Sequence, residues 1–125
     1  MASNPLVVAP EDTLAEVAER LVEQEGPAAV VAEYGRLIGI LTTADLLRAC
    51  AARAHPSEAR VREWMTAEPV TIPLGTTLSA AAMLMREYGI NHLPVVEGER
   101  PVGLVGMGDV VRAGMPFGTG IGLGL

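Results

Sequence analysis

The chain has 125 residues, half of them hydrophobic, and a formal net charge of −6, with arginine as its only strong cation. An acidic chain without a basic run is repelled by phosphate backbones, and 3% aromatic residues leave few stacking platforms, which argues against nucleic-acid binding. Cys50 stands alone and cannot form an internal disulfide. We see no basic signal-peptide region and no apolar run of membrane-spanning length, so we expect a soluble, cytoplasmic protein that contacts no membrane.

The chain repeats itself at an offset of 64 residues, without a gap. A half of about 60 residues alone would bury only roughly 60% of its unfolded surface and be marginally stable. We therefore expect one module in which two similar units cover each other. The matching pairs are Pro5 with Pro69, Thr13-Leu14 with Thr77-Leu78, Glu23 with Glu87, Val31 with Val95, Glu33 with Glu97, Arg36 with Arg100, Gly39 with Gly103, Asp45 with Asp109, and Arg48-Ala49 with Arg112-Ala113.

The first unit has the pattern strand, helix, hairpin, helix. Asp12 is the predicted N-cap of the first helix, because its side chain can accept a hydrogen bond from a free N–H, and Gly26 ends that helix. The expected elements are a strand at 6–8, a helix from 14, strands at 28–33 and 37–41 around a tight turn, and a helix at 44–53. The apolar face of the first helix has helical spacing at Leu14, Val17, Ala18, Leu21 and Val22.

The second unit has the same pattern, with Thr76 as the predicted N-cap of its first helix and Gly89 as the stop. Its expected elements are a strand at 70–72, a helix from 78, strands at 93–97 and 102–105, and a helix at 108–113. We expect a linker at about 54–66 with one helical turn at 61–65. We place the first repeat with its linker at residues 1–59, the second repeat at 60–113 and a Gly-rich tail at 114–125.

The order β-α-β-β-α, present twice, predicts an α/β fold. The helices of such a unit cover one face of its sheet and leave the other face bare, and a bare apolar face must be buried. The second copy is the obvious cover. We therefore expect two repeats related by a pseudo-twofold axis, with their sheets packed together inside and their helices outside, and a ligand cleft between them.

The step from Gly39 to Asp45 connects a strand to a helix through Thr42 and carries the clearest chemical signal. One interpretation is a capping box, in which Thr42 is the N-cap and Asp45 reaches back to the cap N–H. The other is a ligand site. The helix N-terminus offers free N–H groups and partial positive charge to a phosphate, and Asp45 could accept hydrogen bonds from a ribose diol. The residues leave both interpretations open.

The doubled unit resembles a pair of CBS domains, named after cystathionine β-synthase. The resemblance rests on the Gly39–Asp45 step, on Leu93-Pro94-Val95-Val96, and on Val61-Arg62-Glu63-Trp64-Met65-Thr66, and it covers about residues 4–113. Members of this family commonly bind AMP, ADP, ATP or S-adenosylmethionine between the two repeats. The resemblance therefore implies a regulatory module that binds such an adenosine-type ligand and requires no other cofactor.

Two sites follow from the resemblance. In the mirror site Asp109 is kept, but Gly106 replaces the counterpart of Thr42 and the facing residues Ala28 and Ala29 are apolar, so we expect this site to be weaker. The first site is implied to comprise Thr42, Thr43, Asp45, Val70, Thr71, Ile72, Asn91, His92, Leu93 and Pro94.

The resemblance also implies a homodimer that acts on an effector protein in trans, because no effector domain occurs in the sequence. A ligand-free module used only for dimerisation is the alternative. Cys50 and His55 lack a third, orienting group, so we predict no catalytic residues and no enzyme. Two histidines and one cysteine do not make a zinc site, and we predict no metal.

Overall fold

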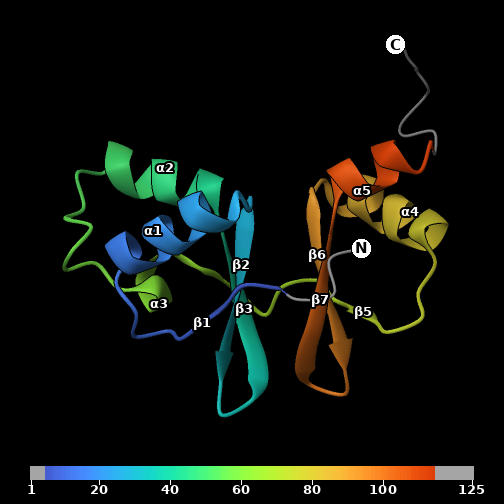
Figure 1. Cartoon of the computed structure of the whole chain (residues 1–125), viewed down its shortest axis with the longest axis horizontal. Coiled ribbons are helices and arrows are strands. Elements are labelled where there is room, and N and C mark those ends of the chain that lie inside the picture. The colour runs from blue at the N-terminus through green and yellow to red at the C-terminus, as the bar shows by residue number, and fades with distance from the viewer. Residues whose placement is uncertain (1–4, 115–125) are drawn as a thin grey trace.

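Two small sheets stand face to face at the centre of the molecule, and each is backed on its outer side by the helices of its own repeat (Figure 1). The computed structural model describes residues 5–114, so the predicted tail lies outside the described residues except for Gly114. The first repeat contains β1 (Val7–Val8), α1 (Leu14–Gln24), β2 (Ala28–Glu33), β3 (Arg36–Thr42) and α2 (Thr43–Ala51).

The second repeat follows the linker elements α3 (Val61–Trp64) and β4 (Thr66–Ala67). Its own elements are β5 (Ile72–Pro73), α4 (Leu78–Tyr88), β6 (His92–Glu97), β7 (Arg100–Gly106) and α5 (Met107–Arg112). The predicted α/β fold of two β-α-β-β-α repeats, with sheets inside and helices outside, is therefore confirmed. The helical turn predicted at residues 61–65 is α3.

The linker also adds an unpredicted strand to the first sheet, which has the order β1-β2-β3-β4, whereas the second has the order β5-β6-β7. In both sheets the first strand is parallel to its neighbour and the hairpin is antiparallel. In β4, Ala67 pairs with Gly39 of β3. A Cβ at Gly39 would lie 2.9 Å from the Thr66 carbonyl oxygen and 2.7 Å from the Met65 sulfur, so this close approach requires glycine.

The N-cap of helix α1 lies one residue later than the sequence predicted. Its N-cap is Thr13, whose hydroxyl accepts from the Glu16 N–H at 3.1 Å while the Glu16 carboxylate accepts from the Thr13 N–H at 2.8 Å. Asp12 was the wrong choice because only Thr13 has a glutamate three residues later, which completes a capping box. In the second repeat, likewise, Thr77 rather than Thr76 is the cap of α4.

Each repeat has its own apolar core. In α1, Leu14, Val17 and Leu21 are buried as predicted, but Val22 is 77% exposed because it lies at the edge of the apolar stripe. Val61 is fully buried and closes the core of the first repeat, although the predicted boundary assigned it to the second. The linker is therefore part of the first repeat's packing.

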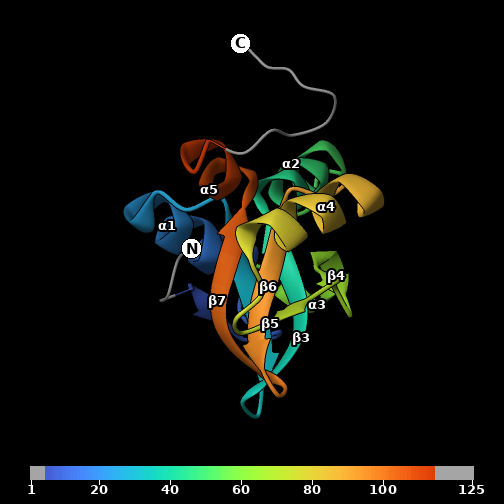
Figure 2. The same cartoon turned by 90° about the vertical axis from the view of Figure 1, so that its right-hand side faces the viewer.

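The repeats meet through their sheets and their hairpin turns. At the turns, the Leu37 N–H donates to the Glu99 carbonyl at 2.8 Å, and the Arg36 guanidinium pairs with the Glu99 carboxylate, with Nε 2.8 Å from Oε1. In Figure 2 the hairpin turns lie at one end of the molecule and α1, α2, α4 and α5 lie at the other. The apolar cluster between the sheets consists of Ala28, Val30, Ile40 and Leu104, with Leu37 packed against it.

Within residues 5–114, none of the helices combines the length and the apolar composition needed to cross a bilayer.

Candidate functional site

A capping box begins α2 at the rim of the space between the repeats. The Asp45 carboxylate accepts from the Thr42 N–H at 2.8 Å and from the Thr42 hydroxyl at 3.1 Å, and the Asp45 N–H donates to that hydroxyl at 3.3 Å. The other carboxylate oxygen of Asp45 pairs with Arg48 one turn later. The capping interpretation of this step is therefore confirmed.

Asp45 is 2% exposed and is not among the residues that line the cleft between the repeats at this helix start. Its carboxylate is occupied by Thr42 and Arg48, so in this conformation it holds the start of α2 and presents no free oxygen to a ligand. The residues it positions, Thr42 and Thr43, lie at the cavity surface. In this conformation Asp45 therefore supports the cleft surface from beneath. A hydrogen bond to a ribose would require its carboxylate to be accessible from the cleft.

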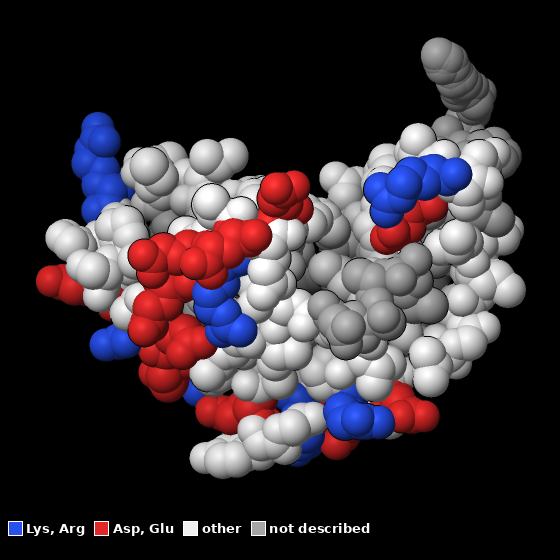
Figure 3. Space-filling view, viewed as in Figure 1, with Lys and Arg blue, Asp and Glu red and all other residues white. Residues whose placement is uncertain are grey.

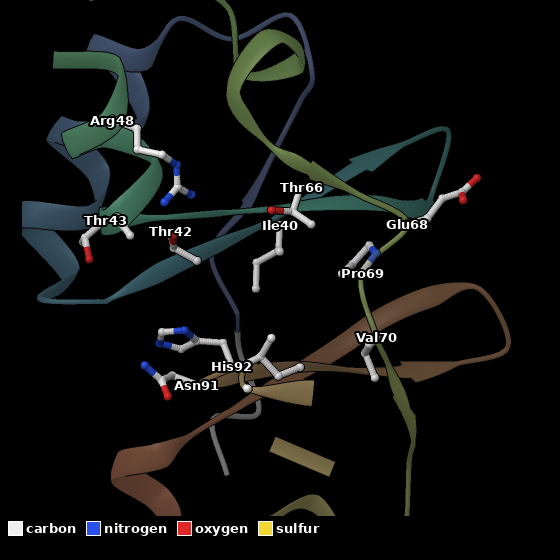
Figure 4. A pocket seen from close by; sticks show the side chains of 13 residues that line it. Ile40, Thr42, Thr43, Arg48, Thr66, Glu68, Pro69, Val70, Asn91 and His92 are labelled. Carbon is white, nitrogen blue, oxygen red and sulfur yellow. The ribbon is translucent and has the colours of Figure 1, made fainter. Parts of the chain in front are cut away.

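A first cleft of about 490 Å³ opens between the repeats beside the start of α2. Figure 3 shows the face of the molecule that carries α1 and α5, where the surface is hollowed between the two repeats and acidic side chains gather over the first repeat. In Figure 4 the side chains of Thr42, Asn91 and His92 gather at one end of this cleft, and Glu68 points away from it. The lining residues are Ile40, Thr42, Thr43, Ala44, Arg48, Thr66, Glu68, Pro69, Val70, Gly89, Ile90, Asn91 and His92.

Half of the residues predicted for the first site line this cleft. They are Thr42, Thr43, Val70, Asn91 and His92. The predicted residues that do not line it are Asp45, Thr71, Ile72, Leu93 and Pro94, of which Thr71 is exposed and the other four are buried. The last three lie on strands β5 and β6, whereas the lining residues Val70, Asn91 and His92 lie before β5 or at the start of β6.

Sequence reasoning missed several lining residues, above all Arg48. The signal was present, because Arg48 lies three residues after Asp45 on the same helix face and is repeated as Arg112 after Asp109. Glu68 and Pro69 directly follow β4, whose pairing with β3 no local pattern predicted.

A second cleft of about 570 Å³ lies at the start of α5, so it is not smaller than the first. Asp109 lines it as predicted, but Ala28 and Ala29 are buried and do not. Glu25 supplies a charged group that was not predicted. The other lining residues are Pro27, Asn91, His92, Leu104, Gly106, Met107, Gly108 and Arg112.

Asp109 keeps its negative charge in the second cleft. Burial opposes ionisation, but the Gly106 N–H, which donates at 2.7 Å, and the Arg112 guanidinium hold the pKa of the Asp109 carboxyl below its ordinary value. Gly106 has no hydroxyl, so this cap lacks the side-chain bond that Thr42 provides in the first repeat.

His92 begins β6 and is half-buried, so it is not simply an exposed loop histidine. Burial lowers the pKa of the His92 imidazole below its ordinary value of 6.5, and the Asp109 charge offsets part of this effect. The folded protein therefore binds a proton at His92 less readily than the unfolded chain does.

We expect two results from this lowered pKa. The His92 ring should titrate with a midpoint below pH 6.5 in an NMR titration. Its contribution to the free energy of unfolding should fall as the pH drops below 6.5 toward the folded-state pKa, because the unfolded chain binds more protons in that window. His92→Gln should remove this dependence, whereas a midpoint at or above 6.5 would contradict the assigned environment.

Comparison with known families decides what this pair of repeats is. The sequence model of the CBS domain matches residues 1–52 and 61–115. The chain belongs to the CBS domain family. The CBS domain-containing protein YhcV of Bacillus subtilis is 31% identical over 110 residues, which cover 88% of this chain and 79% of YhcV.

Longer proteins carry the same CBS pair. The CBS domain-containing protein CBSCBSPB1 of Arabidopsis thaliana is 36% identical over 95% of this chain, and inosine-5′-monophosphate dehydrogenase of Aquifex aeolicus is 34% identical over 90%. This chain spans only 22% of the former and 23% of the latter. The matched segment is thus a minor part of each of these longer relatives.

Solved CBS structures share the fold closely. The CBS-domain containing protein ATU1752 of Agrobacterium tumefaciens has 29% identity and a TM-score of 0.81, covering 90% of this chain and 91% of that chain. The CBS domain pair of protein MJ0100, solved in complex with 5′-methylthioadenosine and S-adenosyl-L-methionine, has 25% identity and a TM-score of 0.82, covering 90% and 92%.

Proposed function

We propose that this CBS pair is a regulatory module that binds an adenosine-type nucleotide, such as AMP, ADP, ATP or S-adenosylmethionine, in the first cleft. The observation that carries the proposal is the meeting of Thr42 and Thr43, at the start of α2, with Asn91 and His92 from the other repeat. A helix start offers N–H groups and partial positive charge to an anion, and the hydroxyl, amide and imidazole groups can add hydrogen bonds.

The rest of the first cleft suits a nucleoside. Ile40, Pro69, Val70 and Ile90 line it with apolar surface, against which a base can pack. A pocket that is mostly apolar with a few convergent polar groups is typical of small-molecule sites. The complex of MJ0100 with two adenosine compounds supports the same ligand class here.

Ligand binding in the cleft would change the angle between the repeats and act on a separate effector protein. The repeats touch through the small apolar cluster between the sheets and the pairing of Arg36 with Glu99, so a ligand that contacts both repeats can favour one arrangement over another. We propose binding rather than catalysis, because His55 pairs with Ser57 at 2.8 Å and Cys50 lies in a separate apolar groove. A cytoplasmic location stays the prediction from the single cysteine.

A thermal-shift screen tests the proposal. AMP, ADP, ATP, S-adenosylmethionine and NAD are added at 1 mM, and at least one adenosine-type ligand is expected to raise Tm, because a ligand that binds only the native state stabilises it by mass action. At about 100 times Kd the gain is roughly 2.7 kcal/mol, which is several degrees for a domain of this size. If none of them shifts Tm, the ligand-free dimerisation module becomes the better account.

A homodimer is the expected assembly, because each helix of the two repeats displays a large apolar side chain on its outer surface. Light scattering should give twice the mass of 13.1 kDa, and Leu47→Arg should produce a monomer if α2 lies in the interface. A monomeric mass for the unaltered protein would contradict the dimer. The exposed large apolar side chains on these helices are Val22 on α1, Leu47 on α2, Met83 and Tyr88 on α4, and Val111 on α5.

A further inference from the structure

The two clefts are separated by a wall that they share. Asn91 and His92 line both the first and the second cleft, while every other lining residue belongs to one cleft only. The shared wall is therefore a short segment of chain at the start of β6, and its two side chains are accessible from both clefts.

The pairing of residues within each hairpin explains why the wall stands in the second repeat. His92 pairs with Gly106 across β6 and β7, and the equivalent pair in the first repeat is Ala28 with Thr42. A Cβ at Gly106 would lie 3.4 Å from the His92 ring, so the glycine leaves room for the imidazole. Each of these pairs thus combines a small residue with a larger one. Only in the second repeat is the larger residue a histidine, whose ring lies between the two clefts.

The wall is also connected to the helix that begins the second cleft. The Asn91 carbonyl accepts from the Met107 N–H, the first residue of α5, at 2.9 Å. A ligand in the first cleft that displaces Asn91 therefore acts on the start of α5 directly. The equivalent bond in the first repeat runs from the Thr43 N–H to the Pro27 carbonyl at 3.1 Å, and Pro27 lines the second cleft. Asn91, which lines the first cleft, thus accepts a hydrogen bond from the start of α5 at the second cleft. Pro27, which lines the second cleft, accepts one from the start of α2 at the first cleft.

We propose that the two clefts are negatively coupled for phosphorylated ligands through the shared wall of Asn91 and His92. This inference rests on nucleotide binding in the first cleft, as proposed above. The single imidazole of His92 cannot bind two anions as strongly as it binds one. In addition, a phosphate in one cleft repels a phosphate in the other. For any two unit charges about 10 Å apart, repulsion of this kind weakens binding about 2-fold in bulk water and about 15-fold at an effective dielectric constant of about 20. Coupling of this kind is reciprocal.

A matched pair of blocking variants isolates each cleft. Ala44 is exposed in the first turn of α2 and lines only the first cleft, and Gly108 occupies the equivalent position in α5 and lines only the second. Ala44→Trp should fill the first cleft and Gly108→Trp the second. A Cβ at Gly108 would lie 3.2 Å from the Arg112 Nη1, which is the end of a flexible side chain and can shift to admit it.

AMP affinity is measured by calorimetry in each blocked variant and in the unaltered protein. The second AMP should bind the unaltered protein about 3- to 10-fold more weakly than AMP binds the same cleft when the other is blocked. Adenosine, which has no phosphate, should show no such difference. An AMP isotherm equal to the sum of the two blocked variants would overturn the coupling, and so would a loss of all AMP binding in Ala44→Trp, which would mean that the second cleft is not a site. Absence of AMP binding to the unaltered protein would instead contradict AMP as the ligand of the proposed function.

Discussion

Asp45→Ala is expected to lower the free energy of unfolding by about 2 kcal/mol and to weaken nucleotide binding in the first cleft about 10-fold. The carboxylate of Asp45, which is 2% exposed, accepts from the Thr42 N–H and hydroxyl, so its removal leaves the Thr42 N–H without this partner. Little of the loss should come from the ion pair with Arg48, whose side chain is 64% exposed. Binding falls because the start of α2 no longer presents Thr42 and Thr43 in one geometry.

Asp109→Ala is the matched control for this prediction. Asp109 has the same role at the start of α5, but its side chain is 15% exposed and Gly106 offers it no hydroxyl. We expect a loss of about 1 kcal/mol and almost unchanged binding in the first cleft. Urea unfolding and calorimetry measure both quantities. Equal losses of stability in the two variants, or unchanged affinity in Asp45→Ala, would show that the buried cap does not organise the site.

Leu93→Ala should have the largest effect on stability, about 3 kcal/mol, because Leu93 is fully buried in the core of the second repeat and its truncation leaves a cavity. Leu74→Ala is the control. Leu74 belongs to the same repeat but is 54% exposed, so its truncation should change the free energy of unfolding by no more than about 0.5 kcal/mol. Comparable losses in the two variants would mean that the core of the second repeat is not packed as described.

The repeat and its helical and strand periodicity were sufficient to predict the fold. Residues 64 apart occupy equivalent elements, and the buried positions Leu14, Val17 and Leu21 follow from helical spacing alone. The caps were harder, because Asp12 and Thr13 are both good capping residues and the choice depended on Glu16. Strand β4 was missed because its pairing with β3 depends on how the linker folds back.

The sequence predicted the chain segments that form the candidate site but not all of the residues that line it. Family resemblance gives the sequence segments that approach a ligand, but it does not separate residues at the cavity surface from residues behind them. Asp45 carries the clearest motif and is buried, whereas Arg48 had no motif and lines the cleft. The sharing of Asn91 and His92 by two clefts depends on how the repeats pack together, which local sequence does not encode.

An AMP titration followed by amide chemical shifts tests the central claim most directly. If the cleft between the repeats is the ligand site, the largest changes should fall on Thr43, Val70 and Asn91, which come from three separate segments and meet only there. Changes concentrated instead at the apolar groove of Leu14 and Cys50, or no changes with AMP, ATP or S-adenosylmethionine, would contradict a nucleotide site between the repeats.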